Sequence, residues 1–451
     1  MTRASGRDGR AAYIVGRGVC YPMLALALAG APAAAKDSPL TVEASARVRG
    51  EAVSRDFRAG SQADRSAVLT RVNLSVVYDA GAVELGGEVQ DARAHAASSG
   101  AVDEDEANAL EPIQAWVRLR LSADTSLQIG RFTLDLGGRR FAARTNFRNT
   151  NNGFTGARLD TKAGPAAITA FWTMPSVRLP DDDAGIERHR VVLDRDRFGF
   201  QFFGGVATLG DAKTGAFEVT AVRLYERDAA GIDTRDRRLW GVGLRHVREP
   251  ASGAFDHEVE VGVQGGRARG SSSPADVRDR RVAAGFIRAQ AGYSFGGAWS
   301  PRLQLAADYA SGDGRGDTLG RYDTFFGDGS FEFGPSSLYS LVARANLLSA
   351  EARVEVEPGD RTDGYLAVRP LWLARATDAF GNSGVRDPAG ASGRHAGTQV
   401  EGRVRHWLVE DRLRLTGGAA WLARGRFLRD APNAAATGDT LYGYLELSLE
   451  L

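Results

Sequence analysis

Apolar and polar residues alternate with a period of two along most of this chain. Residues 441–451 show the pattern clearly, because leucines alternate with polar or aromatic residues up to Leu451. The same alternation runs through residues 42–49, 72–78 and 113–121. A period of two places successive side chains on opposite faces of a β-strand, whereas a helix requires a period of about 3.6. The chain is therefore predicted to be all-β, with strands that each have one apolar face.

The first 35 residues have the features of a secretory signal peptide. Basic residues between Arg3 and Arg17 precede an apolar stretch, 19–30, and Ala33-Ala34-Ala35 fits an A-x-A cleavage site. The apolar stretch is too short to span a bilayer as a helix of the mature protein. Cleavage would remove Cys20, the single cysteine, so the mature protein would have no thiol chemistry. We therefore divide the chain into a signal peptide, 1–35, and an exported domain, 36–451.

Alternation alone does not distinguish a membrane barrel from a soluble sandwich, because strands of both have one apolar face. Three features favour a transmembrane antiparallel up-and-down β-barrel. The signal peptide is the first. The second is the number of strands, about 18, which exceeds that of one ordinary sandwich. The third is an alternation of short and long connections, typical of periplasmic turns and external loops. The expected location is the bacterial outer membrane.

The connections also suggest which loops enter the lumen. Residues 337–345 could form another strand, but an odd strand count would leave the two termini on opposite sides of the membrane. We therefore assign this segment to a long loop that folds into the lumen, and we predict loops 311–345 and 375–394 as gates. Short connections are assigned near 79–82, 122–125, 161–165, 296–300, 358–362 and 408–411, and long ones near 92–110, 133–156, 174–196, 267–280, 311–345, 375–394 and 424–439.

Arginine supplies nearly all the positive charge, since lysine occurs only at positions 36, 162 and 213. The guanidinium fork binds carboxylates through paired hydrogen bonds, and a ring of such groups would select anions in a pore. Arginines and glutamates on neighbouring strands can instead pair with each other and stiffen the wall. The polar faces include Arg47, Arg71 and Arg414. The residues predicted for the substrate path are Arg118, Arg120, Arg131, Arg139, Arg140, Arg144, Arg148, Arg353, Arg369, Arg403 and Arg405.

The sequence has few signs of an enzyme, a metal site or a nucleic-acid binder. A net charge of +1 argues against nucleic-acid binding. None of the histidines has the paired spacing of a zinc site, and no nucleophile elbow or phosphate-binding loop is present. Asp308, Asp313 and Asp317 lie in a glycine-rich stretch with oxygen ligands suited to Ca²⁺, but Arg315 would oppose a cation. We expect no catalytic residue and no cofactor, with these aspartates as a weak calcium candidate.

Residues 130–159 contain the runs Gly130-Arg131, Gly137-Gly138-Arg139-Arg140, Phe147-Arg148-Asn149-Thr150 and Phe154-Thr155-Gly156-Ala157-Arg158-Leu159. These runs resemble the alginate export family of outer-membrane barrels. In that family a strand ends in Gly-Arg, and a loop with further Gly and Arg leads to an aromatic-Arg-Asn-Thr run and then Phe-x-Gly-x-Arg-Leu. Gly138 departs from the family pattern, which has an acid there, and so does Phe147, where a tryptophan is usual. Two further stretches, 308–347 and 421–444, support the resemblance.

The resemblance implies a barrel of about 18 strands with an electropositive constriction for a polyuronate, which carries one carboxylate per sugar. Several weak arginine sites would replace the hydration of each carboxylate without stalling the polymer. The expected function is passive, anion-selective passage of an acidic polysaccharide such as alginate or its oligomers. A general or small-solute-selective anion porin is the alternative, and a barrel enzyme or a structural anchor is a third reading. Expected partners are outer-membrane lipid and lipopolysaccharide, the acidic polysaccharide or another anionic solute, and periplasmic export machinery, around a monomeric barrel.

Overall fold

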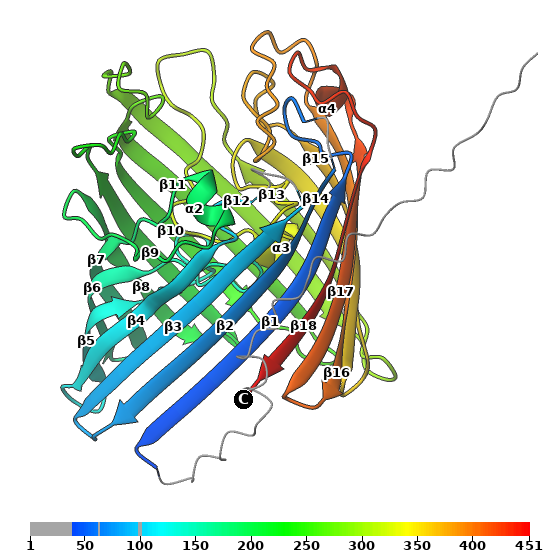
Figure 1. Ribbon diagram of the computed structural model, residues 1–451. Helices are drawn as coiled ribbons and strands as arrows, with labels where there is room; N and C mark the ends of the chain where they lie inside the picture. The colour runs from blue at the N-terminus through cyan, green and yellow to red at the C-terminus, as the bar shows by residue number, and fades with distance from the viewer. Residues whose placement is uncertain (1–37, 62–63, 98–101) are drawn as a thin grey trace, which may run out of the picture. The chain divides into compact units, whose positions relative to one another are not determined.

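The computed structural model describes residues 38–61, 64–97 and 102–451, so the predicted signal peptide, 1–35, lies outside the described residues. The described chain forms one antiparallel sheet of 18 strands, and pairing of β1 with β18 closes it into a barrel (Figure 1). All the remaining pairings join strands that are adjacent in the sequence, which is the predicted up-and-down order. The strands are β1 (Leu40–Ser54), β2 (Arg65–Asp79), β3 (Val83–Ala96), β4 (Asn108–Arg120), β5 (Thr125–Phe132), β6 (Phe154–Ala163), β7 (Ala166–Pro175), β8 (Phe200–Asp211), β9 (Gly215–Glu226), β10 (Arg238–Arg248), β11 (Phe255–Ala268), β12 (Arg280–Ser294), β13 (Arg302–Ala310), β14 (Leu347–Gly359), β15 (Thr362–Trp372), β16 (His395–Val409), β17 (Leu413–Arg424) and β18 (Thr440–Glu450).

Among the described residues, helical structure is confined to short turns within the loops. The helices of the described chain are α2 (Asp183–Glu187), α3 (Ser330–Phe333) and α4 (Arg426–Asp430). In that part of the chain, none of the helices has the length and apolar character needed to cross a membrane.

The strands place apolar side chains on the outer surface and polar side chains inside. In β1, Val48 is 37% exposed, whereas its neighbour Arg49 is fully buried. In β18, Leu445 is 61% exposed and Glu446 only 8%. An outer wall of exposed aliphatic residues requires lipid as its solvent. The period-two pattern therefore predicted both the strands and the orientation of their faces correctly.

The long loops gather at one rim of the barrel and the short turns at the other (Figure 1). The assigned short and long connections all occur near the predicted positions, and 337–345 is a loop as expected. Four connections were not assigned from the sequence: those between β1 and β2, β8 and β9, β9 and β10, and β10 and β11.

Two long loops, 133–153 and 311–346, fold into the barrel and meet there. Ala142 and Phe326 form a parallel β-bridge between them, in which the Phe326 amide donates to the Phe141 carbonyl at 3.1 Å. Phe202 of the wall packs against Phe326 with 5.0 Å between ring centroids, and against Phe325 at 5.9 Å. The hydrophobic core of this protein therefore lies inside the barrel, between the wall and these two loops, which we call the plug loops.

A third loop, 373–394, packs on the second plug loop. Arg321 donates to the Asp378 carboxylate at 3.1 Å and to the Gly381 carbonyl at 2.8 Å. The Asn346 amide donates to the Ala379 carbonyl at 3.0 Å, and Phe380 is fully buried. The two segments predicted as gates, 311–345 and 375–394, are therefore held together, and their movement would be coupled.

The lipid-facing wall can be tested at Leu305, which is 67% exposed near the middle of β13. We expect Leu305→Arg to destabilise the barrel by about 2–4 kcal/mol, because a lipid-facing charge near the bilayer midplane loses its hydration. Urea unfolding in lipid vesicles measures the loss. Leu193→Arg is the matched control, since Leu193 is 56% exposed but lies in the loop between β7 and β8. Equal losses in the two variants would contradict a lipid-facing β13.

Candidate functional site

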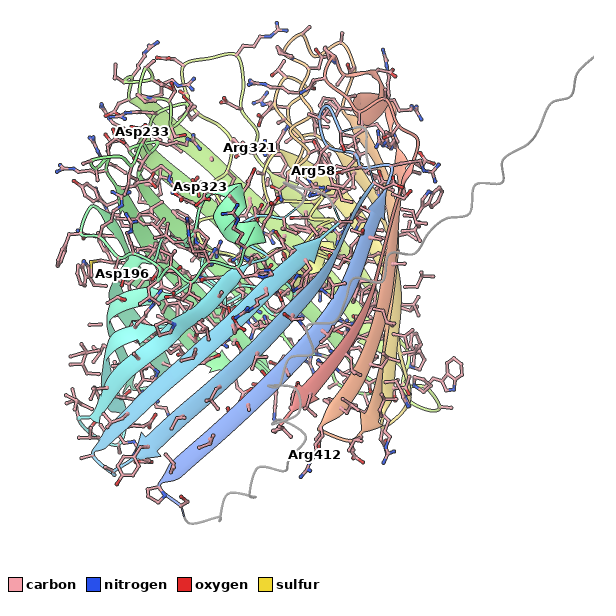
Figure 2. The ribbon with its side chains drawn as sticks, in the orientation of Figure 1. Arg58, Asp196, Asp233, Arg321, Asp323 and Arg412 are labelled. Carbon is pink, nitrogen blue, oxygen red and sulfur yellow. The ribbon has the colours of Figure 1, made fainter. Side chains whose placement is uncertain are left out.

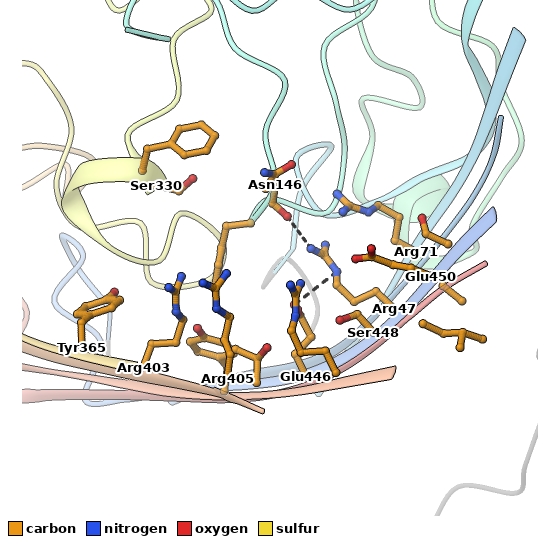
Figure 3. Close-up of a pocket in the computed structure, with 18 of the residues that line it drawn as sticks. Arg47, Arg71, Asn146, Ser330, Tyr365, Arg403, Arg405, Glu446, Ser448 and Glu450 are labelled. Atoms are coloured by element: carbon orange, nitrogen blue, oxygen red, sulfur yellow. Dashed lines mark hydrogen bonds and ion pairs between the residues drawn. The ribbon is translucent and has the colours of Figure 1, made fainter. Parts of the chain in front are cut away.

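A cavity of about 540 Å³ lies inside the barrel, between the plug loops and the short-turn rim (Figure 3). Its wall comes from β1, β2 and β14–β18, and its roof from plug-loop segments 146–147 and 330–331. Six arginines and three glutamates line it, which gives a surplus of three positive charges among the lining residues. Asp363, which pairs with Arg403 and Arg405, offsets part of this surplus. We call this space the arginine cavity, and its charged residues are Arg47, Arg71, Arg353, Arg403, Arg405, Arg414, Glu355, Glu446 and Glu450.

Strand alternation aims these arginines inward. Arg403 and Arg405 flank Val404, which is 58% exposed on the outer wall. Arg414 precedes Leu415, which is 36% exposed on the same outer surface. Since neighbouring residues of a strand point to opposite faces, an apolar residue that faces lipid places its arginine neighbours in the lumen.

The cavity arginines differ in how far they are neutralised. Arg405 donates through Nε to both oxygens of Asp363 at 2.9 Å, and Arg403 lies 3.6 Å from the same carboxylate. Within the described residues, Arg71 and Arg414 have no carboxylate oxygen within 4.0 Å. Arg71 donates to the Arg148 carbonyl at 3.1 Å, and the Arg414 guanidinium lies 4.9 Å from the Trp407 ring centroid. These two side chains keep unpaired positive charge that a solute carboxylate could meet.

Arginines of β1 hold the roof of the cavity in place. Arg47 donates to the Asn146 carbonyl at 2.7 Å (Figure 3) and to the Asn149 side chain at 2.9 Å. Arg49 donates to the Phe147 carbonyl at 2.7 Å, and its guanidinium lies 4.0 Å from the Phe147 ring centroid. The first plug loop is therefore fixed to the wall by its backbone carbonyls, and Arg47 has little capacity left for a solute.

A buried ion-pair network fixes the second plug loop. Arg288 lies 2.9 Å from Asp308 and 3.3 Å from Glu332 of α3, and Arg140 of the first plug loop also pairs with Glu332. Arg344 and Arg369 lie 3.5 Å and 3.2 Å from Asp308. Burial, and then the nearby positive charge of Arg140, lower the pKa of Arg344 to about 10. Each side chain of this network is at most 7% exposed, and Arg140 and Arg344 also border a smaller cavity on the loop side.

A second cavity of about 180 Å³ borders the same plug-loop segments. Asn146 and Phe147 line the arginine cavity, whereas the residues on either side of them, Thr145 and Arg148, line the smaller one. Likewise, segment 330–331 lines the first cavity and segment 327–329 the second. The barrier between the two cavities therefore consists of two short segments, 145–148 and 327–331.

Charge is concentrated on the loop side of this barrier. Arg148 lies 3.1 Å from Asp105, which also pairs with Arg178. Burial works against the charged form of Arg148, but Asp105 and Asp328 outweigh it and raise its pKa. The Arg148 guanidinium therefore stays charged at the barrier, with a carboxylate beside it.

The predicted path residues divide into groups. Arg353, Arg403 and Arg405 line the arginine cavity, and Arg139 lies at its edge, with its guanidinium 4.6 Å from the Phe331 ring centroid. Arg140 and Arg369 belong to the buried network, and Arg148 to the barrier. The sequence analysis placed Arg47, Arg71 and Arg414 on the polar face but did not select them for the path. Like Arg403, they point into the lumen and line the arginine cavity.

The remaining predicted residues lie apart from the cavity. Arg118 and Arg120 pair with Glu84 at 2.9 and 2.8 Å near the short-turn rim, and Arg144 pairs with Glu88 at 2.5 Å. Arg131 has the strand parity of Ile129, which is 50% exposed on the outer wall, and it lies near the loop end of β5. It lies 2.6 Å from Glu111 and 3.4 Å from Asp194.

The structure does not bring the three calcium candidates together. Asp308 is buried in the ion-pair network, Asp317 lies 2.6 Å from Arg278, and Asp313 accepts from the Gly320 amide at 3.0 Å. In the described part of the chain no group of three or more His, Cys, Asp or Glu side chains is placed to hold a metal ion.

Asp194 provides a pH-dependent contact outside the strands. Burial and the nearby Glu111 carboxylate raise the pKa of Asp194 to about 6. Its carboxylate accepts from Asn108 of β4 at 3.0 Å and from the Leu179 amide at 3.1 Å, so it holds the loop between β7 and β8.

We expect this loop to be docked most firmly at low pH. The pKa of Asp194 is higher in the folded protein than its unfolded value of about 3.9, so protonation of this carboxyl stabilises the docked loop. This stabilisation is complete below the unfolded pKa and is lost as the pH rises through the folded pKa. Limited proteolysis between pH 4 and 8 should show cleavage of this loop increasing through about pH 6. Asp194→Asn should remove that dependence, whereas Asp196→Asn, which alters an exposed carboxylate of the same loop, should retain it. The same profile in both variants would contradict the role of Asp194.

Solved outer-membrane proteins share this fold. OccK2 (OpdF) of Pseudomonas aeruginosa is 16% identical with a TM-score of 0.56, and the match covers 91% of this chain and 98% of that one. A structure of OccK2 in complex with glucuronate matches at 15% identity and 0.56, with 91% and 98% covered. OccAB1 of Acinetobacter baumannii matches at 13% identity and 0.58, with 91% and 96% covered. At these identities the likeness shows the fold alone.

No curated protein matches the chain. The sequence profile named "Alginate export" matches residues 38–440, which is nearly the whole barrel. This match agrees with the resemblance seen in residues 130–159 and with the closed barrel of 18 strands. The chain therefore belongs to the alginate export family and is a β-barrel channel of the bacterial outer membrane.

Proposed function

We propose that this barrel is a passive, anion-selective channel for an acidic polysaccharide such as alginate or its oligomers. The observation that carries the proposal is the excess of arginine over glutamate in the lining of the arginine cavity, where Arg71 and Arg414 have no carboxylate partner among the described residues. A solute with one carboxylate per sugar would meet a guanidinium at several points of the wall in succession. The family match supports the choice of substrate class.

The contacts of the cavity are suited to weak, repeated binding. Arg71 and Arg414 have guanidinium groups without a carboxylate partner among the described residues, so they would make the first charge-assisted contacts. Arg403 and Arg405 already share Asp363, so a solute carboxylate would compete with that acid for them. Conduction requires sites that bind strongly enough to admit a solute and weakly enough to release it. The acids of the wall therefore limit the affinity of each arginine.

The plug loops set the narrow part of the proposed path. A saccharide that moves between the two cavities has to pass segments 145–148 and 327–331. The first is held by Arg47 and Arg49 and the second by the network around Glu332. We propose that this barrier is the constriction, with Arg139 and Arg148 at its edges, and that the barrel functions as a monomer in lipid and lipopolysaccharide.

A small-solute anion porin is the second candidate. The observation that favours it is the extent of the plug, because many buried contacts hold both loops across the lumen and leave separate cavities instead of one wide pore. OccK2 has been solved with glucuronate and OpdK of Pseudomonas aeruginosa with vanillate, and both ligands are small carboxylates. A monomeric sugar acid would need less displacement of the barrier than a polymer.

Current through single channels in planar bilayers distinguishes these functions. For the proposed function we expect a reversal potential that favours anions in a salt gradient, and concentration-dependent block by hexuronate oligomers but not by neutral oligomers of the same length. Anion-selective current without oligomer block would support the small-solute porin. A cation-selective or non-selective channel would contradict both.

A further inference from the structure

A further arginine-rich cavity, of about 570 Å³, lies at the long-loop rim. The arginine cavity lies on the other side of the plug loops, toward the short-turn rim. Figure 2 shows Arg321 toward the long-loop rim and Arg412 at the opposite one. The pocket is formed by the loop between β9 and β10, the start of β12, and loops 311–346 and 373–394. We call it the outer arginine pocket, and its charged residues are Arg235, Arg280, Arg315, Arg321, Arg386, Asp313 and Asp378.

The positive charge of this pocket is poorly compensated. Arg321 pairs with Asp378 at 3.1 Å. Within the described ranges, the other four arginines have no carboxylate oxygen within 4.0 Å. In contrast, the arginines of the plug network each have at least one carboxylate partner. An uncompensated group of arginines around one cavity is a site for an anion.

The two acids of the pocket are occupied by backbone groups. Asp378 accepts from the amides of Asp313 and Ala379 at 2.9 and 2.8 Å. Asp313 accepts from the Gly320 amide at 3.0 Å. Both carboxylates therefore shape the loops, and they leave Arg235, Arg280, Arg315 and Arg386 to determine the charge that a solute would meet.

Backbone carbonyls hold several of the arginines in place. Arg315 donates to the Ala389 carbonyl at 2.8 Å, and Arg386 donates through Nε to the Thr377 carbonyl at 3.0 Å. Arg235 donates through Nε to the Arg269 carbonyl at 3.2 Å. Burial is the largest cause that lowers the pKa of Arg235. The carboxylates of Asp323 and Glu226 offset part of this lowering, whereas the positive charges of Arg237 and Arg280 add to it. A bound anion would relieve this repulsion between fixed cations.

The pocket opens on the interior side of the wall. Arg280 has the strand parity of Val282 and Phe286, which are 5% and 1% exposed inside the barrel, whereas Ile287 is 47% exposed on the outer surface. Leu319, which also lines the pocket, forms a β-bridge with Val282. A solute in the mouth of the barrel can reach this position directly, while lipid contacts the opposite face of β12.

We infer that the outer arginine pocket is a second carboxylate-binding site, which holds the acidic saccharide at the external mouth of the channel. The inference rests on the proposed function, because the ligand is the same acidic saccharide. The site would hold one part of the chain while the arginine cavity, beyond the barrier, holds another. Phosphate groups of lipopolysaccharide have related chemistry and are the alternative source of the anion.

The test compares binding of a hexuronate oligomer to the wild type and to the double variant Arg315→Gln/Arg386→Gln. Both side chains are exposed loop residues outside the strand pairing, so the barrel should fold. We expect calorimetric affinity and block from the loop side to weaken roughly tenfold or more, because each variant removes a charge-assisted hydrogen bond. Block by oligomer added on the short-turn side should be unchanged. Arg278→Gln is the matched control, since Arg278 is exposed at the same rim and outside the pocket.

The outcomes separate this site from the channel function. Unchanged binding and unchanged loop-side block in the double variant would overturn the outer site, even if the wild type conducts and is blocked. If the wild type were not blocked from either side, weakened calorimetric binding in the double variant would still support the site. Loss of lipopolysaccharide retention with unchanged oligomer binding would assign the pocket to lipid phosphate and overturn the inference.

Discussion

Replacing Arg403, Arg405 and Arg414 with glutamine is expected to abolish anion selectivity and to weaken block by hexuronate oligomers at least a hundredfold. The triple variant removes the whole surplus of three positive charges from the arginine cavity. Each charge-assisted hydrogen bond contributes about 1.5–3 kcal/mol, and about 1.4 kcal/mol corresponds to a tenfold change in affinity. Loss of two such contacts already gives the expected effect. The reversal potential in a salt gradient measures the selectivity.

Arg412→Gln is the control for the triple variant. Arg412 is exposed in the turn between β16 and β17 and does not line the cavity (Figure 2). Its loss should change the net charge of the rim and leave selectivity and block nearly as in the wild type. A triple variant that folds into a heat-stable barrel and keeps both properties would exclude the arginine cavity from the path.

Glu332→Ala is expected to loosen the second plug loop by about 3 kcal/mol. Removal of one partner of a buried ion pair typically costs about 3–5 kcal/mol, because the other charge stays buried without compensation. The low end applies because Arg140 retains Glu258 at 2.6 Å and Arg288 retains Asp308 at 2.9 Å. Cleavage of loop 311–346 by trypsin should become roughly a hundredfold faster, since it follows the population of the undocked loop. Single-channel current should become larger and noisier.

Asp317→Ala is the matched control in the same loop. Asp317 pairs with Arg278 at 2.6 Å, but both side chains are at least 66% exposed. An exposed pair contributes about 0–1 kcal/mol, so both the cleavage rate and the conductance should change little. Glu332→Ala with wild-type conductance and wild-type protease resistance would show that the buried network does not hold the plug.

The sequence predicted the barrel well because strand structure here depends on local alternation. Val404 between Arg403 and Arg405 is sufficient to orient three residues, since one face needs lipid and the other needs water. The number of strands also assigned segment 337–345 to a loop, because a closed barrel with both termini on one side needs an even strand count. The connections after β1, β8, β9 and β10 were not assigned, although each contains charged residues.

The candidate site was predicted less completely, because its arrangement depends on contacts between distant residues. Arg369 and Arg405 have the same inward parity, yet Arg369 lies 3.2 Å from Asp308 in the buried network and Arg405 lines the cavity. What separates them is the position of the second plug loop, whose contact with the first is a bridge between Ala142 and Phe326. Neither residue carries a sequence signal for this pairing. The outer arginine pocket likewise requires three loops to meet.

The bridge between the plug loops has a mechanical consequence for the barrel. The first loop leaves the wall between β5 and β6 and the second between β13 and β14, so their roots lie on nearly opposite sides of the ring of 18 strands. Joined at Ala142 and Phe326, they connect opposite sides of the wall across the lumen. This connection should resist flattening of the barrel under lateral membrane pressure. In an empty barrel of this width, only the hydrogen bonds between strands would resist that deformation. The contacts that join the plug loops would therefore affect both the passage of a solute and the stiffness of the barrel cross-section.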